Sequence, residues 1–125
     1  MINMQKVIFK TQVVSIGEEA LDFSSINMLI FFGENAPSAL KPSCFLIRVS
    51  PTSMPITTGM RLQIDNQSYV ITAVGNEVSD NLNRLGHIAV RFTGEKKADL
   101  PGSLYVEKKD FPIISKGTVV QIVSN

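Results

Sequence analysis

The stretch Tyr69-Val-Ile-Thr-Ala-Val-Gly75, continued ten residues on by Leu85-Gly-His-Ile-Ala-Val-Arg-Phe92, decides how this chain folds. Val70 to Val74 is almost wholly apolar and largely β-branched, which is typical of a strand covered on both faces. The second segment has the same character, and a polar interval separates the two. The stretch therefore predicts a strand, a short helix and a second strand.

The polar interval carries helix signals at both ends. Ser79 or Asp80 can cap a short helix by accepting hydrogen bonds from free backbone N–H groups, and Gly86 is suited to end it. His87, the only histidine in the chain, is then expected at the first position of the second strand.

Alternation divides the second strand into two faces. The apolar face is expected in the core, and the other is mixed and includes His87. Along a strand, Arg91 would lie about 13 Å from His87. The core face consists of Ile88, Val90 and Phe92, and the mixed face of His87, Ala89 and Arg91.

Length and composition favour one globular domain over residues 1–125. A net charge of +1 argues against nucleic-acid binding. A single cysteine, Cys44, excludes an internal disulfide framework and fits a reducing compartment. No apolar run approaches the ~20 residues that span a bilayer, and residues 1–11 lack the apolar region of a secretion signal. We expect a cytoplasmic protein that is not itself inserted in a membrane.

Strand signals dominate the rest of the chain. Apolar or β-branched segments alternate with Gly, Pro and polar clusters, and only 18–23 suggests another helical turn. Many short strands and one short helix before His87 predict an all-β fold, a small barrel or barrel-like sandwich, and we favour the closed barrel because it has no exposed edges. The expected strands include 7–16, 27–32, 44–50 (with Phe45, Ile47 and Val49 on one face), 59–64, 103–106 and 118–123.

The chain contains no fixed-period repeat, but it does contain a faint internal echo. Thr57-Thr-Gly59 precedes the apolar residues of one expected strand, and Ser115-Lys-Gly117 precedes those of the last.

Few residues could carry chemistry. One Cys and one His cannot make a zinc site without carboxylates or a second chain, so no metal or cofactor is expected. The chain contains neither a Gly-x-Ser-x-Gly turn nor a phosphate-binding Gly-x-x-x-x-Gly-Lys loop. A reactive pair of Cys44 with His87 stays open, although a lone cysteine is more often a small buried apolar residue.

His87 has a structural and a functional interpretation. It could be a polar strand residue bonded to a backbone carbonyl, or an imidazole nucleophile towards phosphorus. The second role requires one free ring nitrogen, the other fixed by a hydrogen bond, and nearby cationic or N–H groups for the phosphoryl oxygens. Candidates for that support are Arg91, Arg84 and the helix N–H groups around Asp80 and Asn81.

Ordered motifs cover nearly the whole chain. They include Met28-Leu-Ile30, Ala36-Pro37, Cys44-Phe45, Thr72-Ala-Val-Gly75, Asp80-Asn-Leu82, Leu85-Gly-His-Ile-Ala-Val-Arg-Phe92, Pro101-Gly102 and Lys116-Gly-Thr118. Together they resemble the glucitol/sorbitol-specific enzyme IIA component of the phosphoenolpyruvate-dependent sugar phosphotransferase system.

The resemblance implies a β-rich cytoplasmic phosphocarrier. Such a protein accepts a phosphoryl group on histidine from the histidine-containing phosphocarrier protein. It passes the group to the sugar-specific IIB unit, and the sugar is phosphorylated as it enters through the membrane component, IIC. In this chain His87 would be the catalytic residue and Arg91 would stabilise the phosphoryl group. A homodimer formed through spare strand edges stays open.

The chain departs from the family pattern at one position. That pattern places the phosphorylated histidine in the strand directly after the Cys-Phe pair, where this chain has Ile47. Isoleucine cannot carry a phosphoryl group. Either His87 is the acceptor, or the chain is a non-catalytic regulatory or partner-binding relative; a ligand-binding barrel is a third hypothesis.

Overall fold

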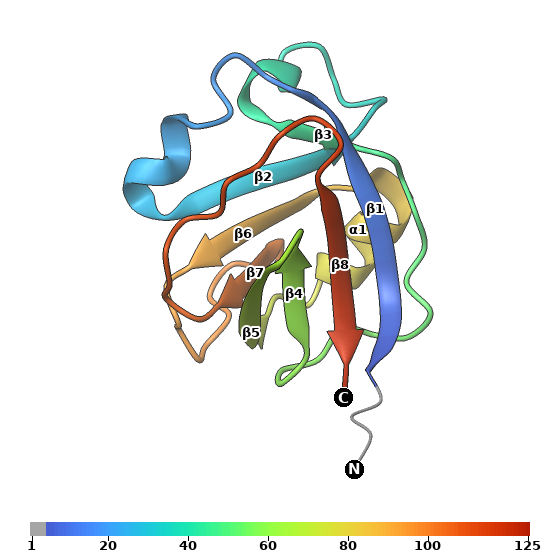
Figure 1. Cartoon of the computed structure of the whole chain (residues 1–125), viewed down its shortest axis with the longest axis vertical. Coiled ribbons are helices and arrows are strands. Elements are labelled where there is room, and N and C mark those ends of the chain that lie inside the picture. Colours follow the sequence, from blue (N-terminus) through green and yellow to red (C-terminus); the bar gives the residue numbers. More distant parts are fainter. Residues whose placement is uncertain (1–4) are drawn as a thin grey trace.

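Eight strands form a closed barrel in the computed structural model, which describes residues 5–125. Around the barrel their order is β1-β3-β2-β6-β7-β5-β4-β8, and β8 pairs back onto β1 (Figure 1). The all-β barrel expected from the sequence is confirmed. The strands are β1 Lys6–Ile16, β2 Met28–Gly33, β3 Phe45–Ile47, β4 Arg61–Ile64, β5 Gln67–Val74, β6 Ile88–Phe92, β7 Ser103–Val106 and β8 Val119–Ser124; the helices are η1 Asp22–Ile26, η2 Lys41–Ser43 and α1 Val78–Leu85.

The stretch that decides the fold forms β5, α1 and β6, as predicted. Gly86 ends α1 in a left-handed conformation with φ of 67°, which glycine adopts at little cost. The expected side-chain cap is wrong: the residue before the helix is Glu77, which makes no capping hydrogen bond. Ser79 Oγ instead accepts the N–H of Ile56 (3.3 Å), so it joins the helix to the preceding loop.

The two halves of the barrel repeat one arrangement. β3 pairs antiparallel with β1 and parallel with β2, and β7 pairs in the same way with β5 and β6. The halves meet at the antiparallel pairs β2–β6 and β4–β8. Gly59 and Gly117, in the two echoed segments, have φ of 91° and 93° and precede β4 and β8. The faint sequence echo therefore marks a structural repeat.

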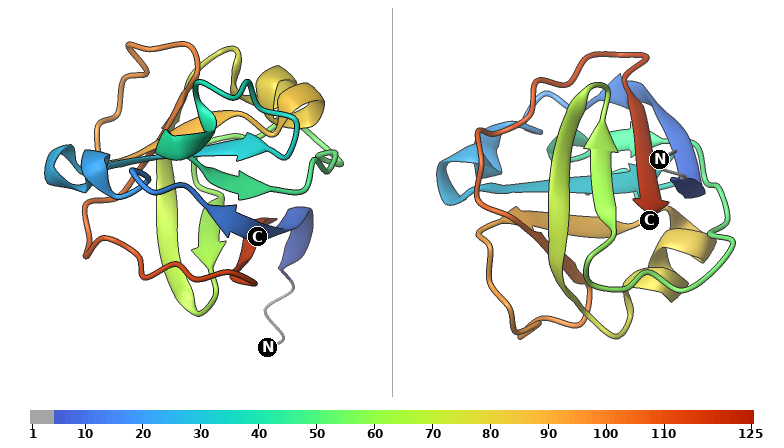
Figure 2. Two further views of the ribbon diagram at one scale, coloured as in Figure 1. Left: turned by 90° about the horizontal axis from the view of Figure 1, so that it is seen from above. Right: turned by 60° about the horizontal axis from the view of Figure 1, so that its bottom comes forward.

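Apolar side chains fill the barrel interior, and a smaller cluster lies outside its wall. Residues of every strand contribute to the interior, including the predicted trio of β6. The outer cluster lies where the 34–44 segment crosses the outside of β2 and β3, in front of them when the barrel is seen from above (Figure 2, left). Its buried members are Phe32, Ala36, Cys44 and Leu46.

The expected strand 44–50 is shorter in the structure, where β3 comprises only Phe45–Ile47. Phe45 and Ile47 face the interior, as their alternation predicted. The placement of Val49 with them is wrong: pairing ends at Ile47, and Val49 is 47% exposed.

Candidate functional site

Two glycines bring His87 against strand β2. A Cβ atom on Gly86 would lie 2.9 Å from the Gly33 backbone nitrogen, and one on Gly33 would lie 2.6 Å from the Leu85 carbonyl oxygen. Only residues without side chains allow the end of α1 to approach the end of β2 this closely. The β2–β6 ladder ends at the pair Phe31–Ile88. His87, expected as the first residue of the strand, therefore lies one position before β6, directly beyond the end of the ladder and beside Phe32.

The His87 imidazole is held on one face and at one edge. Its ring stacks on the Phe32 ring with centroids 4.2 Å apart and planes at 25°. Nδ1 lies 3.4 Å from the Phe31 carbonyl oxygen, a long contact that is a hydrogen bond only in the tautomer with the proton on Nδ1, because a carbonyl only accepts. Within residues 5–125, Nε2 has no hydrogen-bond partner. The half-buried ring thus has one nitrogen occupied and one free.

Exposed apolar side chains border this site. Leu85 is 40% exposed and Val49 is 47% exposed. Both lie against Gly33, since a Cβ there would meet the Leu85 carbonyl and Val49 Cγ2 at 2.6 Å each. The surface formed by Val49 and Leu85, here called the apolar rim, therefore adjoins the end of β2 where His87 lies.

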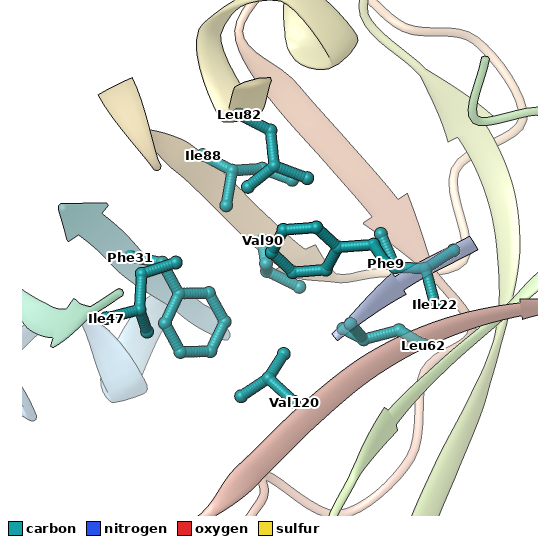
Figure 3. A pocket seen from close by; sticks show the side chains of 9 residues that line it. All are labelled: Phe9, Phe31, Ile47, Leu62, Leu82, Ile88, Val90, Val120 and Ile122. Carbon is teal, nitrogen blue, oxygen red and sulfur yellow. The ribbon is translucent and has the colours of Figure 1, made fainter. Parts of the chain in front are cut away.

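Ile47 lies close to His87 in space, but its side chain is on the inner side of the barrel wall. It is 1% exposed, and its Cγ1 would be 3.5 Å from a Cβ on Gly86. Its side chain lines an apolar interior cavity of about 10 Å³ together with Phe31 (Figure 3). A side chain at this position points away from solvent, whereas the ring of His87 lies outside.

The cationic residues considered for phosphoryl support lie apart from the ring. Arg91 is paired with Met28 at the far end of the β2–β6 ladder, and its Nε donates to Ser103 Oγ (3.0 Å). Arg84 donates to Asp80 in an exposed pair (3.1 Å), a type that contributes little. The N–H groups at the start of α1 are at the opposite end of the helix from His87. The support by these groups stays a prediction.

Cys44 makes no reactive pair with His87 in this structure. Its thiol donates to the Leu40 carbonyl (3.2 Å) within the outer cluster. Burial raises the pKa of the Cys44 thiol, so the nucleophilic thiolate is disfavoured. Within residues 5–125, no group of three or more His, Cys, Asp and Glu side chains could hold a metal ion. His87 is the group best placed for chemistry.

A comparison of the amino-acid sequence with models of known protein families identifies one match. The model described as PTS system glucitol/sorbitol-specific IIA component matches residues 8–121. The chain belongs to that family. Glucitol/sorbitol-specific EIIA components of Escherichia coli K12 and Shigella flexneri are each 35% identical over 118 residues, covering 94% of this chain and 96% of theirs. The resemblance noted in the sequence is confirmed.

The fold of this IIA-family chain is also similar to that of a solved structure. The crystal structure of a PTS system IIA component from Enterococcus faecalis V583 is similar with a TM-score of 0.80 and 27% identity, over 90% of this chain and 97% of that one. Family and fold agree that this chain is a component of a phosphotransferase system. Within residues 5–125, no helix has the length and apolar character needed to cross a membrane.

The sequence singled out His87 as a candidate but did not predict which residues hold it. Phe32 was expected only as the last residue of the strand 27–32, which stops before Gly33. The available signal was the pair of glycines, Gly33 directly after the apolar segment 27–32 and Gly86 directly before the segment 87–92, since conformational freedom or close backbone approach is a common reason for glycine at such places.

Proposed function

We propose that this chain is the phosphocarrier of a glucitol/sorbitol phosphotransferase system and that His87 is its phosphoryl acceptor. The observation that carries the proposal is the half-buried ring of the only histidine, with Nδ1 towards a carbonyl and Nε2 free. The donor is the histidine-containing phosphocarrier protein, and the recipient is the sugar-specific IIB unit that serves the membrane component IIC.

The transfer needs a nucleophile and a neutral leaving group. The Nε2 lone pair attacks phosphorus of the donor's phosphohistidine, forming a P–N bond as the donor's P–N bond breaks. The donor imidazole already carries a proton on its other nitrogen, so it takes the electron pair of that bond and leaves as a neutral ring. A proton held on Nδ1 by the Phe31 carbonyl leaves the Nε2 lone pair available. The same ring then passes the group to IIB by the reverse chemistry.

The burial of Ile47 supports His87 over position 47. A partner protein has to bring its own phosphohistidine within bonding distance of the acceptor, and a side chain inside the barrel wall is out of its reach. This burial gives no reason to prefer the non-catalytic alternative, because an apolar residue at position 47 suits the interior cavity.

The apolar rim is our proposed docking surface for these partners. Exposed apolar residues next to a reactive group are typical of the centre of a transient interface. Changing Leu85 to Gln should raise KM for the donor about tenfold, because burying a large aliphatic side chain contributes about 1.5–3 kcal/mol. Ile113→Gln is the matched control, since Ile113 is 80% exposed and lies in the loop between β7 and β8. Equal KM values for the two variants would contradict this surface.

The acceptor is tested by reconstitution. Incubation with phosphoenolpyruvate, enzyme I and the small phosphocarrier should add one acid-labile phosphate, detected by mass spectrometry. His87→Ala should abolish the gain, whereas Cys44→Ala should retain it. An equal gain in His87→Ala, or none in the wild-type chain, would contradict the proposal.

A further inference from the structure

Consecutive residues of β2 contact the imidazole of His87 from two directions. The Phe31 carbonyl faces its Nδ1 edge at 3.4 Å, and the Phe32 ring covers one face with centroids 4.2 Å apart. A carbonyl alone would leave the ring free to swing about its χ angles, and a long contact holds it weakly. The stacked ring restricts that rotation.

Phe32 is itself fixed in place. It is 8% exposed, and its neighbours in the outer cluster are the buried side chains of Ala36, Cys44 and Leu46. A side chain packed among buried neighbours has few accessible rotamers. It therefore offers His87 a rigid surface, unlike an exposed side chain that would move with it.

The internal repeat indicates that the barrel does not require this aromatic pair. In the repeat, β2 corresponds to β6 and β3 corresponds to β7. Phe31 pairs with Phe45 in the first half, and Val90 pairs with Leu104 at the equivalent place in the second half. When these two pairs are matched, Phe32 corresponds to Arg91 and Met28 corresponds to His87. The matching pair, Met28 opposite Arg91, holds the same place in the ladder with no stacked rings. The stack therefore occurs at one end of the β2–β6 ladder and is missing at the matching end.

We propose that Phe32 is a positioning residue for phosphoryl transfer: it holds the His87 ring so that Nδ1 keeps its proton towards the Phe31 carbonyl and Nε2 faces the partner. The proposal rests on His87 being the acceptor. Phe32 touches neither phosphorus nor the partner's histidine, and acts only through the ring it orients.

Two measurements on Phe32→Leu test this role. The first is ¹⁵N NMR of the imidazole in the chain alone, where the wild type should show one tautomer with the proton on Nδ1 and Phe32→Leu a mixture. The second is transfer kinetics in the reconstituted system, where kcat should fall about three- to tenfold with little change in KM, as expected for loss of one aromatic pair. Phe32→Tyr, which keeps the flat face, should restore both readouts. Phe32→Met, which fills the site flexibly, replaces Phe32→Leu if the latter does not fold.

The possible results separate this proposal from the proposed function. A wild-type tautomer signal and wild-type kcat in folded Phe32→Leu would overturn the positioning role. So would Phe32→Tyr behaving like Phe32→Leu. If His87→Ala is phosphorylated as well as wild type, the proposed acceptor fails, yet the NMR comparison still decides whether Phe32 orients the ring.

Discussion

Replacing Ile47 by histidine puts an imidazole where the family resemblance expects the phosphorylated residue. In this structure that imidazole would point into the barrel, because Ile47 is 1% exposed and borders an apolar cavity of about 10 Å³. The cavity is hardly large enough for one water and offers no polar lining to bond one. The ring nitrogens would therefore be buried without partners.

The cost follows from burial and packing. An unpaired buried polar group costs about 1–3 kcal/mol, and loss of a well-packed aliphatic side chain adds a similar amount. We expect Ile47→His to lower the free energy of unfolding by about 2–5 kcal/mol, a large part of the 5–15 kcal/mol typical of a domain. Ile47→Val, the control, should cost only about 0.5–1.5 kcal/mol.

The pH dependence gives a second, independent signature. Burial disfavours the charged imidazole, so the folded variant keeps the ring neutral while the unfolded chain protonates it near pH 6.5. Below that pH the unfolded state binds more protons than the folded state, and stability falls. The difference between Ile47→His and wild type should therefore grow as the pH drops from 7 to 5.

Urea unfolding followed by circular dichroism measures these free energies, and the reconstituted phosphotransfer assay measures function. Ile47→His combined with His87→Ala should stay unphosphorylated. The reasoning is refuted if Ile47→His is as stable as Ile47→Val, or if the double variant accepts a phosphoryl group. Either result would mean that position 47 opens to solvent.

Three further predictions concern the glycines, the thiol and the core. Gly86→Ala should lower the free energy of unfolding, measured in urea, by more than Gly117→Ala does, and it should slow phosphorylation of His87. Both glycines have positive φ, but only at Gly86 would the new Cβ meet backbone, 2.9 Å from the Gly33 nitrogen. Equal losses of stability would contradict the close approach of the two backbones. Burial raises the pKa of Cys44 above its ordinary 9.0, so the stability that Cys44 provides relative to Cys44→Ala should be complete below about pH 9 and fall as the pH rises through the raised value; a pH-independent difference would count against it. Phe92→Ala should lower stability by about 3–5 kcal/mol, because Phe92 is 1% exposed, and His87→Ala by less; the reverse order in thermal melts would mean that the faces of β6 are inverted.

The sequence predicted the structure best where a feature depends on the local pattern of residues alone. Alternation identified the inward face of β6, and Gly86 marked the end of α1, because backbone geometry and side-chain period are local properties. The N-terminal cap of α1 was wrong because Ser79 has a distant partner, the N–H of Ile56. The prediction that Val49 faces the core was wrong because the strand pairing ends two residues earlier, at Ile47, and where pairing ends depends on the neighbouring strand.

The sequence by itself determined an all-β chain, the family to which it belongs, and one histidine at the start of a strand. Only the tertiary structure decided what surrounds that histidine. Phe31 and His87 are 56 residues apart, and they meet because two glycine backbones touch where two strands of the closed barrel end. Closure also determines that Ile47 lies inside the wall and His87 outside it, since inside and outside exist only once the last strand pairs with the first.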